Sequence, residues 1–274
     1  MSHSALKNAP LGKSANYISH YQRDLLFTIP RQLKREEIGI HHQLPFQGND
    51  IWNGFELSWL NAKGKPVVAF AEFFIPCESP NLIESKSFKL YLNSFNNTSF
   101  DSFDVVADTL TRDLSDAAKM PVTVKLIPLS KITPSILSHF PGISLDELDI
   151  TCDTYTTEPG YLQTENTVVT ETLHSDLLKS NCLVTGQPDW GSVQIIYTGK
   201  KIQPEGLLKY IVSFRNHDEF HEQCVERIFM DIMKQCTPEK LFVYARYTRR
   251  GGLDINPYRA NYAILLENMR LWRQ

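Results

Sequence analysis

The sequence predicts an α+β fold assembled from two copies of one module. Runs rich in β-branched and aromatic residues alternate with two long segments of helical periodicity, and the order strand, strand, helix, strand occurs twice. The strings SFNNTSF at 94–100 and SFRNHDEF at 213–220 match each other, and each joins a predicted strand to the helix that follows. Such a duplication favours antiparallel sheets with helices on one face.

The N-terminal module begins where the composition changes at Ile51. Residues 55–76 are predicted to form a β-hairpin around a Lys-Gly-Lys-Pro turn at 63–66, and residues 87–95 a third strand. In 102–118 apolar side chains recur every three or four residues, which predicts an amphipathic helix. These side chains are Phe103, Val106, Leu110, Leu114 and Ala117. A strand at 121–129 closes the module.

The C-terminal module repeats this order. Strands are predicted at 191–199 and 207–214, a helix at 219–236 and a last strand at 240–248. The stretch 134–170, rich in Pro and Thr, divides the modules. We therefore expect an N-terminal arm at 1–45, one module at 46–150 and a second at 151–274.

Composition and charge restrict the function. With 274 residues, 42% of them hydrophobic, the chain can bury a full core, and a formal net charge of -3 gives no overall basic field for nucleic acid or an anionic membrane. No secretory signal or run of 18 apolar residues is evident, so we expect a cytoplasmic protein that acts on a small molecule. Five cysteines without a Cys-x-x-Cys pair argue against a disulfide framework or a four-cysteine zinc site.

One cysteine stands close to an acid that chemistry could use. Cys182 is followed by turn-forming residues and by Asp189, which lies between Pro188 and Trp190. A buried thiol and a surface turn are the ordinary interpretation. A partly exposed thiol could instead be a nucleophile, and a carboxyl held beside Trp190 could have a raised pKa and donate a proton.

The start of the second helix offers a possible metal pair. His221 and Cys224 form His-x-x-Cys, and Cys182 could be a third zinc ligand. A solvated histidine in the first turn is the more common arrangement. The pattern therefore leaves a zinc site open without predicting one.

Two further stretches could bind polar ligands. Residues 81–92 resemble an edge strand protected by lysines, but Glu84 could accept amidine-like N–H groups, and Ser85 with Lys86 could hold a phosphate. Residues 246–259 could be a glycine turn between two strands. They could instead form a phosphate-binding loop lined by arginines. No Gly-x-Gly-x-x-Gly follows a strand, so a dinucleotide would bind outside a Rossmann fold.

Long motifs in this chain resemble one enzyme family over nearly its whole length. They are DIWNGFELSWLNAKG at 50–64, LIESKSFKLYLNSFN at 82–96, LLKSNCLVTGQPDWGS at 177–192, VSFRNHDEFHEQCVERI at 212–228 and YARYTRRGGLDINPYR at 244–259. They resemble the NADPH-dependent 7-cyano-7-deazaguanine reductases, the nitrile reductases of queuosine biosynthesis, in their long two-module form. The resemblance implies tandem tunnelling-fold modules, as in GTP cyclohydrolase I, and a homodimer.

The resemblance also implies a role for each motif residue. Cys182 would add to the nitrile to form a thioimide, Asp189 would donate the proton, and His221 would line the site and relay protons. The substrate would contact Ile83, Glu84, Ser85, Phe220, His221 and Glu222. The cofactor NADPH would contact Ser85, Lys86, Arg250 and Gly251, and no metal is implied.

Three other functions stay open at this point. A zinc-dependent purine hydrolase would use Cys182, His221 and Cys224 as ligands. A purine-binding module without catalysis would bury an inert Cys182. Hydrolysis of the nitrile through the same cysteine would release a carboxylic acid and consume no NADPH.

Overall fold

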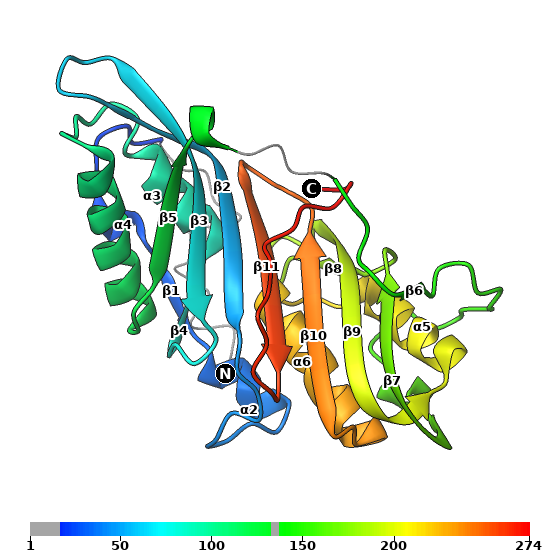
Figure 1. Ribbon diagram of the computed structural model, residues 1–274. Helices are drawn as coiled ribbons and strands as arrows, with labels where there is room; N and C mark the ends of the chain where they lie inside the picture. Colours follow the sequence, from blue (N-terminus) through cyan, green and yellow to red (C-terminus); the bar gives the residue numbers. More distant parts are fainter. Residues whose placement is uncertain (1–16, 133–136) are drawn as a thin grey trace. The chain divides into compact units, whose positions relative to one another are not determined.

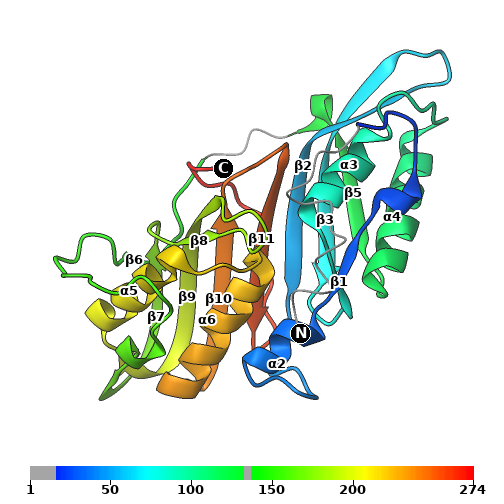
Figure 2. The ribbon, with the colours of Figure 1, turned by 180° about the vertical axis from the view of Figure 1, so that it is seen from behind.

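The computed structural model describes residues 17–132 and 137–274, which form two compact units (Figures 1 and 2). Unit 1 contains residues 17–41, 49–132 and Arg249–Asp254. Unit 2 contains His42–Gly48, 137–248 and Ile255–Gln274. Each unit combines a mostly antiparallel sheet with helices, so the predicted α+β class is confirmed.

In unit 1 a three-stranded antiparallel sheet has the order β5 (Thr123–Pro128), β3 (Pro66–Pro76), β2 (Asn49–Leu60). Helices α3 (Ser85–Asn93) and α4 (Phe103–Ala118) lie on one face of it (Figures 1 and 2). The shorter elements are η1 (Arg23–Leu25), β1 (Thr28–Pro30), α2 (Gln32–Glu37), β4 (Asn81–Ile83), which pairs with β1, and η2 (Leu129–Lys131).

The strands of unit 2 lie in the order β11 (Leu253–Ala260), β10 (Lys240–Tyr247), β9 (Pro188–Ile202), β7 (Thr164–Ser175) and β6 (Ile143–Ser144). Strand β8 (Lys179–Asn181) also pairs with β9. The β6–β7 pair is parallel, whereas β7, β8 and β10 run antiparallel to β9. Helices α5 (Pro204–Ser213) and α6 (His221–Cys236) cover one face (Figure 2). Two 3₁₀ turns, η3 (Pro159–Tyr161) and η4 (Phe214–Asn216), complete the unit.

Most predicted elements are confirmed. The hairpin is β2 and β3, the two amphipathic helices are α4 and α6, and the predicted closing strands are β5 and β10. The strands predicted at 87–95 and 207–214 are wrong, because these segments are helices α3 and α5. A short apolar run does not distinguish strand from helix by periodicity. The decisive local signals precede the runs: Glu84 caps α3, and Pro204 occupies the first turn of α5.

Matching hydrogen bonds support the internal duplication. The Tyr91 hydroxyl on α3 donates to Asp113 Oδ2 on α4 at 2.8 Å, and the Tyr210 hydroxyl on α5 donates to Asp231 Oδ2 on α6 at 2.7 Å. Ser94 and Ser213 each donate to the tyrosine carbonyl three residues earlier, at 2.6 Å. Helices α4 and α6 each span 16 residues.

The compact units do not follow the predicted domain limits of 1–45, 46–150 and 151–274. Residues 137–150 pack within unit 2, because β6 pairs with β7 and Gln194 Nε2 donates to the Pro141 carbonyl. Residues 17–41 of the predicted arm pack within unit 1, where β1 pairs with β4. The arm's first 16 residues lie outside the described part of the chain.

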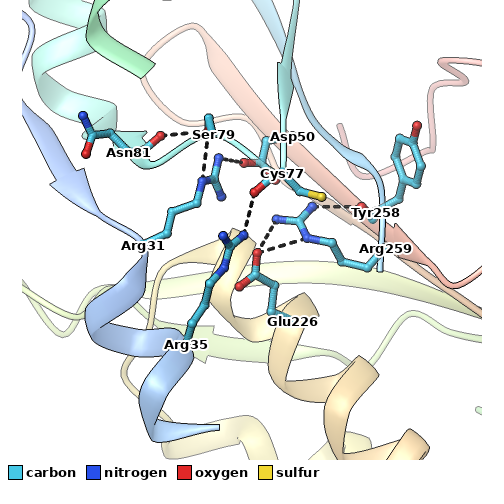
Figure 3. Close-up of polar contacts among 9 residues, drawn as sticks. All are labelled: Arg31, Arg35, Asp50, Cys77, Ser79, Asn81, Glu226, Tyr258 and Arg259. Atoms are coloured by element: carbon cyan, nitrogen blue, oxygen red, sulfur yellow. Dashed lines mark hydrogen bonds and ion pairs between the residues drawn. The ribbon is translucent and has the colours of Figure 1, made fainter. Parts of the chain in front are cut away.

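Buried ion pairs fix part of each unit (Figure 3). In unit 1 Arg31 Nη2 lies 2.5 Å from Asp50 Oδ2, Arg31 Nε donates to Ser79 Oγ, and Arg35 donates to the Cys77 carbonyl. In unit 2 both Nε and Nη2 of Arg259 donate to Glu226 Oε1. Removing one partner would leave a buried charge without compensation, so these contacts constrain the packing. No helix among the described residues is long and apolar enough to cross a membrane.

Candidate functional site

Cys182 and Asp189 belong to one hairpin in unit 2. Strand β8 pairs with the start of β9, with Ser180 opposite Asp189 and Asn181 opposite Pro188, and the Cys182 amide donates to the Gln187 carbonyl at 2.8 Å. Ser180 and Asp189 pair directly and lie on the same face of the hairpin, and Cys182 follows the end of β8. One short hairpin therefore carries both the predicted nucleophile and the predicted proton donor.

Both residues are buried. Cys182 is only 4% exposed, which agrees with the ordinary interpretation of a buried thiol and not with the partly exposed thiol considered beside it. Asp189 is 7% exposed and lies within strand β9 rather than in a surface turn. Burial of this kind removes water from both groups, which strengthens any charge interaction between them and a ligand.

Asn181 connects the hairpin to the start of α6. Its amide N–H donates to the His217 carbonyl at 2.8 Å, and its own carbonyl accepts from the Glu219 amide at 3.0 Å. Its side chain adds a bond from Nδ2 to Asp218 Oδ1 at 3.0 Å. The residue immediately before Cys182 therefore holds the loop that leads to Phe220 and His221.

The first turn of α6 completes the group. His221 Nε2 lies 3.3 Å from Asp189 Oδ2, and the His221 ring is stacked on Tyr247 with 3.8 Å between ring centroids. Phe220 is half-buried at the helix N-cap, and Glu222 is buried. Unit 2 thus carries its five predicted site residues on the β8–β9 hairpin and at the start of α6, and the contact between Asp189 and His221 joins the two segments.

A charged cluster supports this end of α6. Glu219 accepts from Arg227 Nε at 3.0 Å and from Nη2 at 3.1 Å, and His217 Nε2 lies 2.7 Å from the same carboxylate. Burial alone would raise the pKa of Glu219, but the bonds from His217 and Arg227 outweigh it and lower the pKa to about 2. Glu219 is therefore ionised across the neutral range.

The zinc ligands considered from sequence do not match the clustering in the structure. In the described residues the potential ligand atoms that converge belong to His217, Glu219 and Cys224. The guanidinium of Arg227 already occupies both oxygens of Glu219, and burial raises the pKa of the Cys224 thiol. A cysteine binds zinc as a thiolate, and a bound zinc ion would repel the adjacent guanidinium of Arg227. This set of side chains therefore suits a salt bridge better than a zinc site.

In unit 1 the predicted ligand-binding residues gather at the start of α3. The Glu84 carboxylate accepts from the backbone N–H groups of Lys86 at 2.7 Å and Ser87 at 2.8 Å, so it caps the helix. Burial raises the pKa of Glu84, while these two bonds lower it in part. Ile83 is buried, and Ser85 and Lys86 are partly exposed in the first turn.

A glycine turn lies against the same helix. Lys89 Nζ donates to the Gly251 carbonyl and lies 3.0 Å from Glu56 Oε2. Gly251 has φ +62°, and a Cβ there would lie 2.9 Å from Lys89 Cδ, so both conformation and space favour glycine. The guanidinium of the neighbouring Arg249 lies 4.5 Å from the centre of the Phe55 ring, and Arg250 is exposed. Cationic side chains at the two segments suit an anionic ligand such as the phosphates of NADPH.

Several residues that shape the site carried no sequence signal. They are Tyr247, Asn181, Glu219, Arg227 and Lys89. Tyr247 lies opposite Gly191 only because of the register between β9 and β10, which depends on tertiary structure. Glu219 and Arg227 are eight residues apart and Glu219 precedes α6, so the spacing of charged residues along a helix did not indicate this pair.

Comparison with known proteins gives consistent matches. Residues 17–126 match the family model described as nitrile reductase, 7-cyano-7-deazaguanine-reductase N-term, and residues 188–263 match that of a QueF-like protein. The NADPH-dependent 7-cyano-7-deazaguanine reductase of Dechloromonas aromatica is 64% identical over 92% of this chain and 90% of its own length. The enzyme of the same name from Burkholderia thailandensis is 57% identical over 98% of this chain and 99% of its own.

Proposed function

Since the chain belongs to the family of NADPH-dependent 7-cyano-7-deazaguanine reductases, we propose that it reduces the nitrile of 7-cyano-7-deazaguanine to the primary amine in queuosine synthesis, through a thioimide on Cys182. The family membership makes the chain an NADPH-dependent oxidoreductase. The observation that supports the mechanism is the 3.3 Å contact of His221 Nε2 with Asp189 Oδ2, on the hairpin whose other strand leads into Cys182.

In the first step the thiolate of Cys182 forms a bond to the nitrile carbon, and the carbon–nitrogen triple bond becomes a double bond. The nitrogen takes a proton from Asp189, which yields a neutral thioimide. The support is positional: the two residues belong to one β8–β9 hairpin, and both are buried. His221, at 3.3 Å from Asp189, can return the proton to that carboxylate.

NADPH, when bound, supplies one hydride for the thioimide and another for the imine that remains after the Cys182 sulfur departs. Ser85, Lys86, Arg250 and Gly251 are proposed to hold the cofactor. The start of α3 and the glycine turn lie together in unit 1 through the bond from Lys89 to Gly251, and they carry the cationic side chains of Lys86 and Arg250. The residues present therefore suit a ligand with several phosphates.

For the substrate we propose Ile83, Glu84, Ser85, Phe220, His221 and Glu222. A carboxylate offers about four lone-pair positions. Glu84 spends two on backbone N–H groups of α3, so it can still accept from the amidine-like edge of a deazaguanine. The half-buried Phe220 ring can stack on the base.

The assembly and location are also part of the proposal. We infer a homodimer in the cytoplasm that acts on a free base, with no nucleic acid or membrane as partner. The formal net charge of -3 favours a small-molecule substrate over a polyanion. Light scattering coupled to size-exclusion chromatography tests the dimer, and a monomer at working enzyme concentration would contradict it.

The deciding experiment follows NADPH consumption and product mass in one reaction with 7-cyano-7-deazaguanine. Two NADPH oxidised for each aminomethyl product support the proposal. Cys182→Ala should abolish both the reaction and the covalent adduct, whereas Cys152→Ala, which changes a partly exposed thiol elsewhere in unit 2, should retain them.

No loss of NADPH would contradict the proposed function. Release of a carboxylic acid without NADPH oxidation would then indicate nitrile hydrolysis. Stoichiometric zinc that survives dialysis, together with purine hydrolysis, would instead indicate a zinc-dependent hydrolase.

A further inference from the structure

The ring of His221 lies flat against the ring of Tyr247. The two planes differ by 3°, and the ring centroids are 3.8 Å apart. His221 is the first residue of α6 and Tyr247 the last residue of β10, so the stack joins two elements of unit 2 that are distant in sequence. Both rings therefore have a defined relative orientation at the site.

The imidazole has few other contacts that would fix its plane. Its Nδ1 is buried and has no hydrogen-bond partner in the described residues, whereas Nε2 faces Asp189. In many enzymes a bond from Nδ1–H to a carbonyl or carboxylate sets the tautomer and orientation of a histidine. Here the single polar contact at Nε2 would let the ring turn about its Cβ–Cγ bond, and the stack prevents this.

Tyr247 is itself held firmly. It is fully buried, it pairs with Gly191 in the β9–β10 register, and its carbonyl accepts from Gln274 Nε2 at 3.2 Å. A Cβ on Gly191 would lie 3.1 Å from the tyrosine ring, so the ring packs directly on the backbone two residues after Asp189. Tyr247 therefore contacts both β9, the strand that carries Asp189, and the imidazole of His221.

The hydroxyl of Tyr247 is buried without a hydrogen-bond partner that meets ordinary geometry in the described residues, and burial raises the pKa of Tyr247 well above its ordinary value. The tyrosine is therefore neutral at any working pH. Its ring, rather than its hydroxyl, makes the contact with His221.

We propose that Tyr247 is a positioning residue whose ring holds the His221 imidazole in the plane that directs Nε2 to Asp189. The inference deepens the proposed function and rests on the roles of Asp189 and His221 in it. Removing the ring should slow formation of the covalent adduct much more than it changes substrate affinity, because five of the six proposed substrate contacts do not involve His221.

The test compares Tyr247→Phe, which keeps the ring, with Tyr247→Leu, which removes it. The adduct rate is measured in single turnovers without NADPH, and substrate Kd is measured in a Cys182→Ala background. Tyr247→Phe should react at nearly the wild-type rate. Tyr247→Leu should be slower by about tenfold to a hundredfold, since a small displacement of a reacting group has effects of this size.

Phe242→Leu is the matched control, because Phe242 is an equally buried aromatic residue on β10 that packs against Tyr244 and Tyr258. If Tyr247→Leu does not fold, Gly191→Ala offers a second route, since its new Cβ presses on the Tyr247 ring. It should slow the adduct in the same direction.

A spectroscopic signature reports the stack independently of activity. Protons of His221 over the face of the tyrosine should resonate upfield in the wild type and in Tyr247→Phe, and should return toward ordinary positions in Tyr247→Leu. An adduct rate for Tyr247→Leu equal to that of Phe242→Leu would overturn the proposal. Equal slowing in the Phe and Leu variants would also overturn it, because the hydroxyl would then be responsible.

A wild-type protein that forms no adduct would overturn the proposed function instead. In that case unchanged His221 resonances in Tyr247→Leu would also overturn the positioning role, and shifted ones would support it.

Discussion

His221 Nε2 lies 3.3 Å from Asp189 Oδ2, so the carboxyl proposed as proton donor has an imidazole within reach of its oxygen. The pair joins β9 to the first turn of α6, and both residues are largely buried. A proton lost from Asp189 during catalysis can therefore be replaced without direct access of bulk water to the carboxyl.

Asp189→Asn should slow adduct formation strongly. The amide keeps the shape of the side chain but has no proton of suitable acidity, and general acid catalysis contributes about 10²- to 10⁴-fold to rate. Substrate Kd should stay close to the wild-type value. Stopped-flow measurement of the adduct against Asp149→Asn, an exposed carboxylate elsewhere in unit 2, isolates the effect. A normal adduct rate in Asp189→Asn would refute the donor role.

Glu219→Gln should destabilise unit 2 in a pH-dependent way. The pKa of Glu219 is about 2 in the folded protein against an ordinary value of 4.5, so its ion pair adds stability above pH 4.5 and loses it as the pH falls toward 2. At pH 7 the loss should be about 1.5–3 kcal/mol, the range for hydrogen bonds to charged groups.

The measurement is the urea midpoint at pH 7 and at pH 3. The difference between wild type and Glu219→Gln should shrink at the lower pH, while the exposed Glu147→Gln should show no such trend. A constant difference would mean that the charge of Glu219 does not stabilise the fold.

The long periodic elements could be predicted from sequence, but the short apolar ones could not. Helix α4 shows its apolar stripe over 16 residues, enough to separate a period of 3.6 from a period of 2. Helix α3 spans nine residues and α5 spans ten, and their runs of buried apolar residues fit either period. The signals that distinguish the two cases lie just before the runs, in the Glu84 cap of α3 and in Pro204 in the first turn of α5.

Some residues of the candidate site could likewise be predicted from the sequence, and others could not. Cys182 and Asp189 are close in sequence, so a hairpin between them could be anticipated, and the long motifs identified His221. Tyr247 could not be found, since its contact with His221 depends on where β10 pairs with β9. A buried Cys182 was the ordinary interpretation, but a partly exposed thiol stayed open because polar neighbours in sequence do not report what packs above them in space.

The internal repeat allows a matched pair of stability measurements. Tyr210→Phe removes the hydroxyl that donates to Asp231, and Tyr91→Phe removes its counterpart at Asp113. Asp113 keeps bonds from Tyr21 and Arg112. Tyr210→Phe should therefore cost more, about 1.5–3 kcal/mol. Chemical denaturation of the two variants checks the order, and a larger loss for Tyr91→Phe would contradict the account.

Gly251→Ala should weaken NADPH binding. The new Cβ would lie 2.9 Å from Lys89 Cδ and 3.1 Å from Lys89 Nζ, so it would push the lysine away from the glycine turn and disturb Arg250 beside it. We expect NADPH Kd to rise about tenfold, which corresponds to 1.4 kcal/mol. Fluorescence titration of NADPH provides the measurement.

Gly64→Ala is the matched control for that variant. Gly64 also has a positive φ, of +75°, but a Cβ there meets nothing within 4 Å, so it carries the same backbone strain without the contact. If both variants bound NADPH as the wild type does, the glycine turn would have no part in holding the cofactor. If Gly64→Ala weakened binding as much as Gly251→Ala, general strain rather than the Lys89 contact would be the cause.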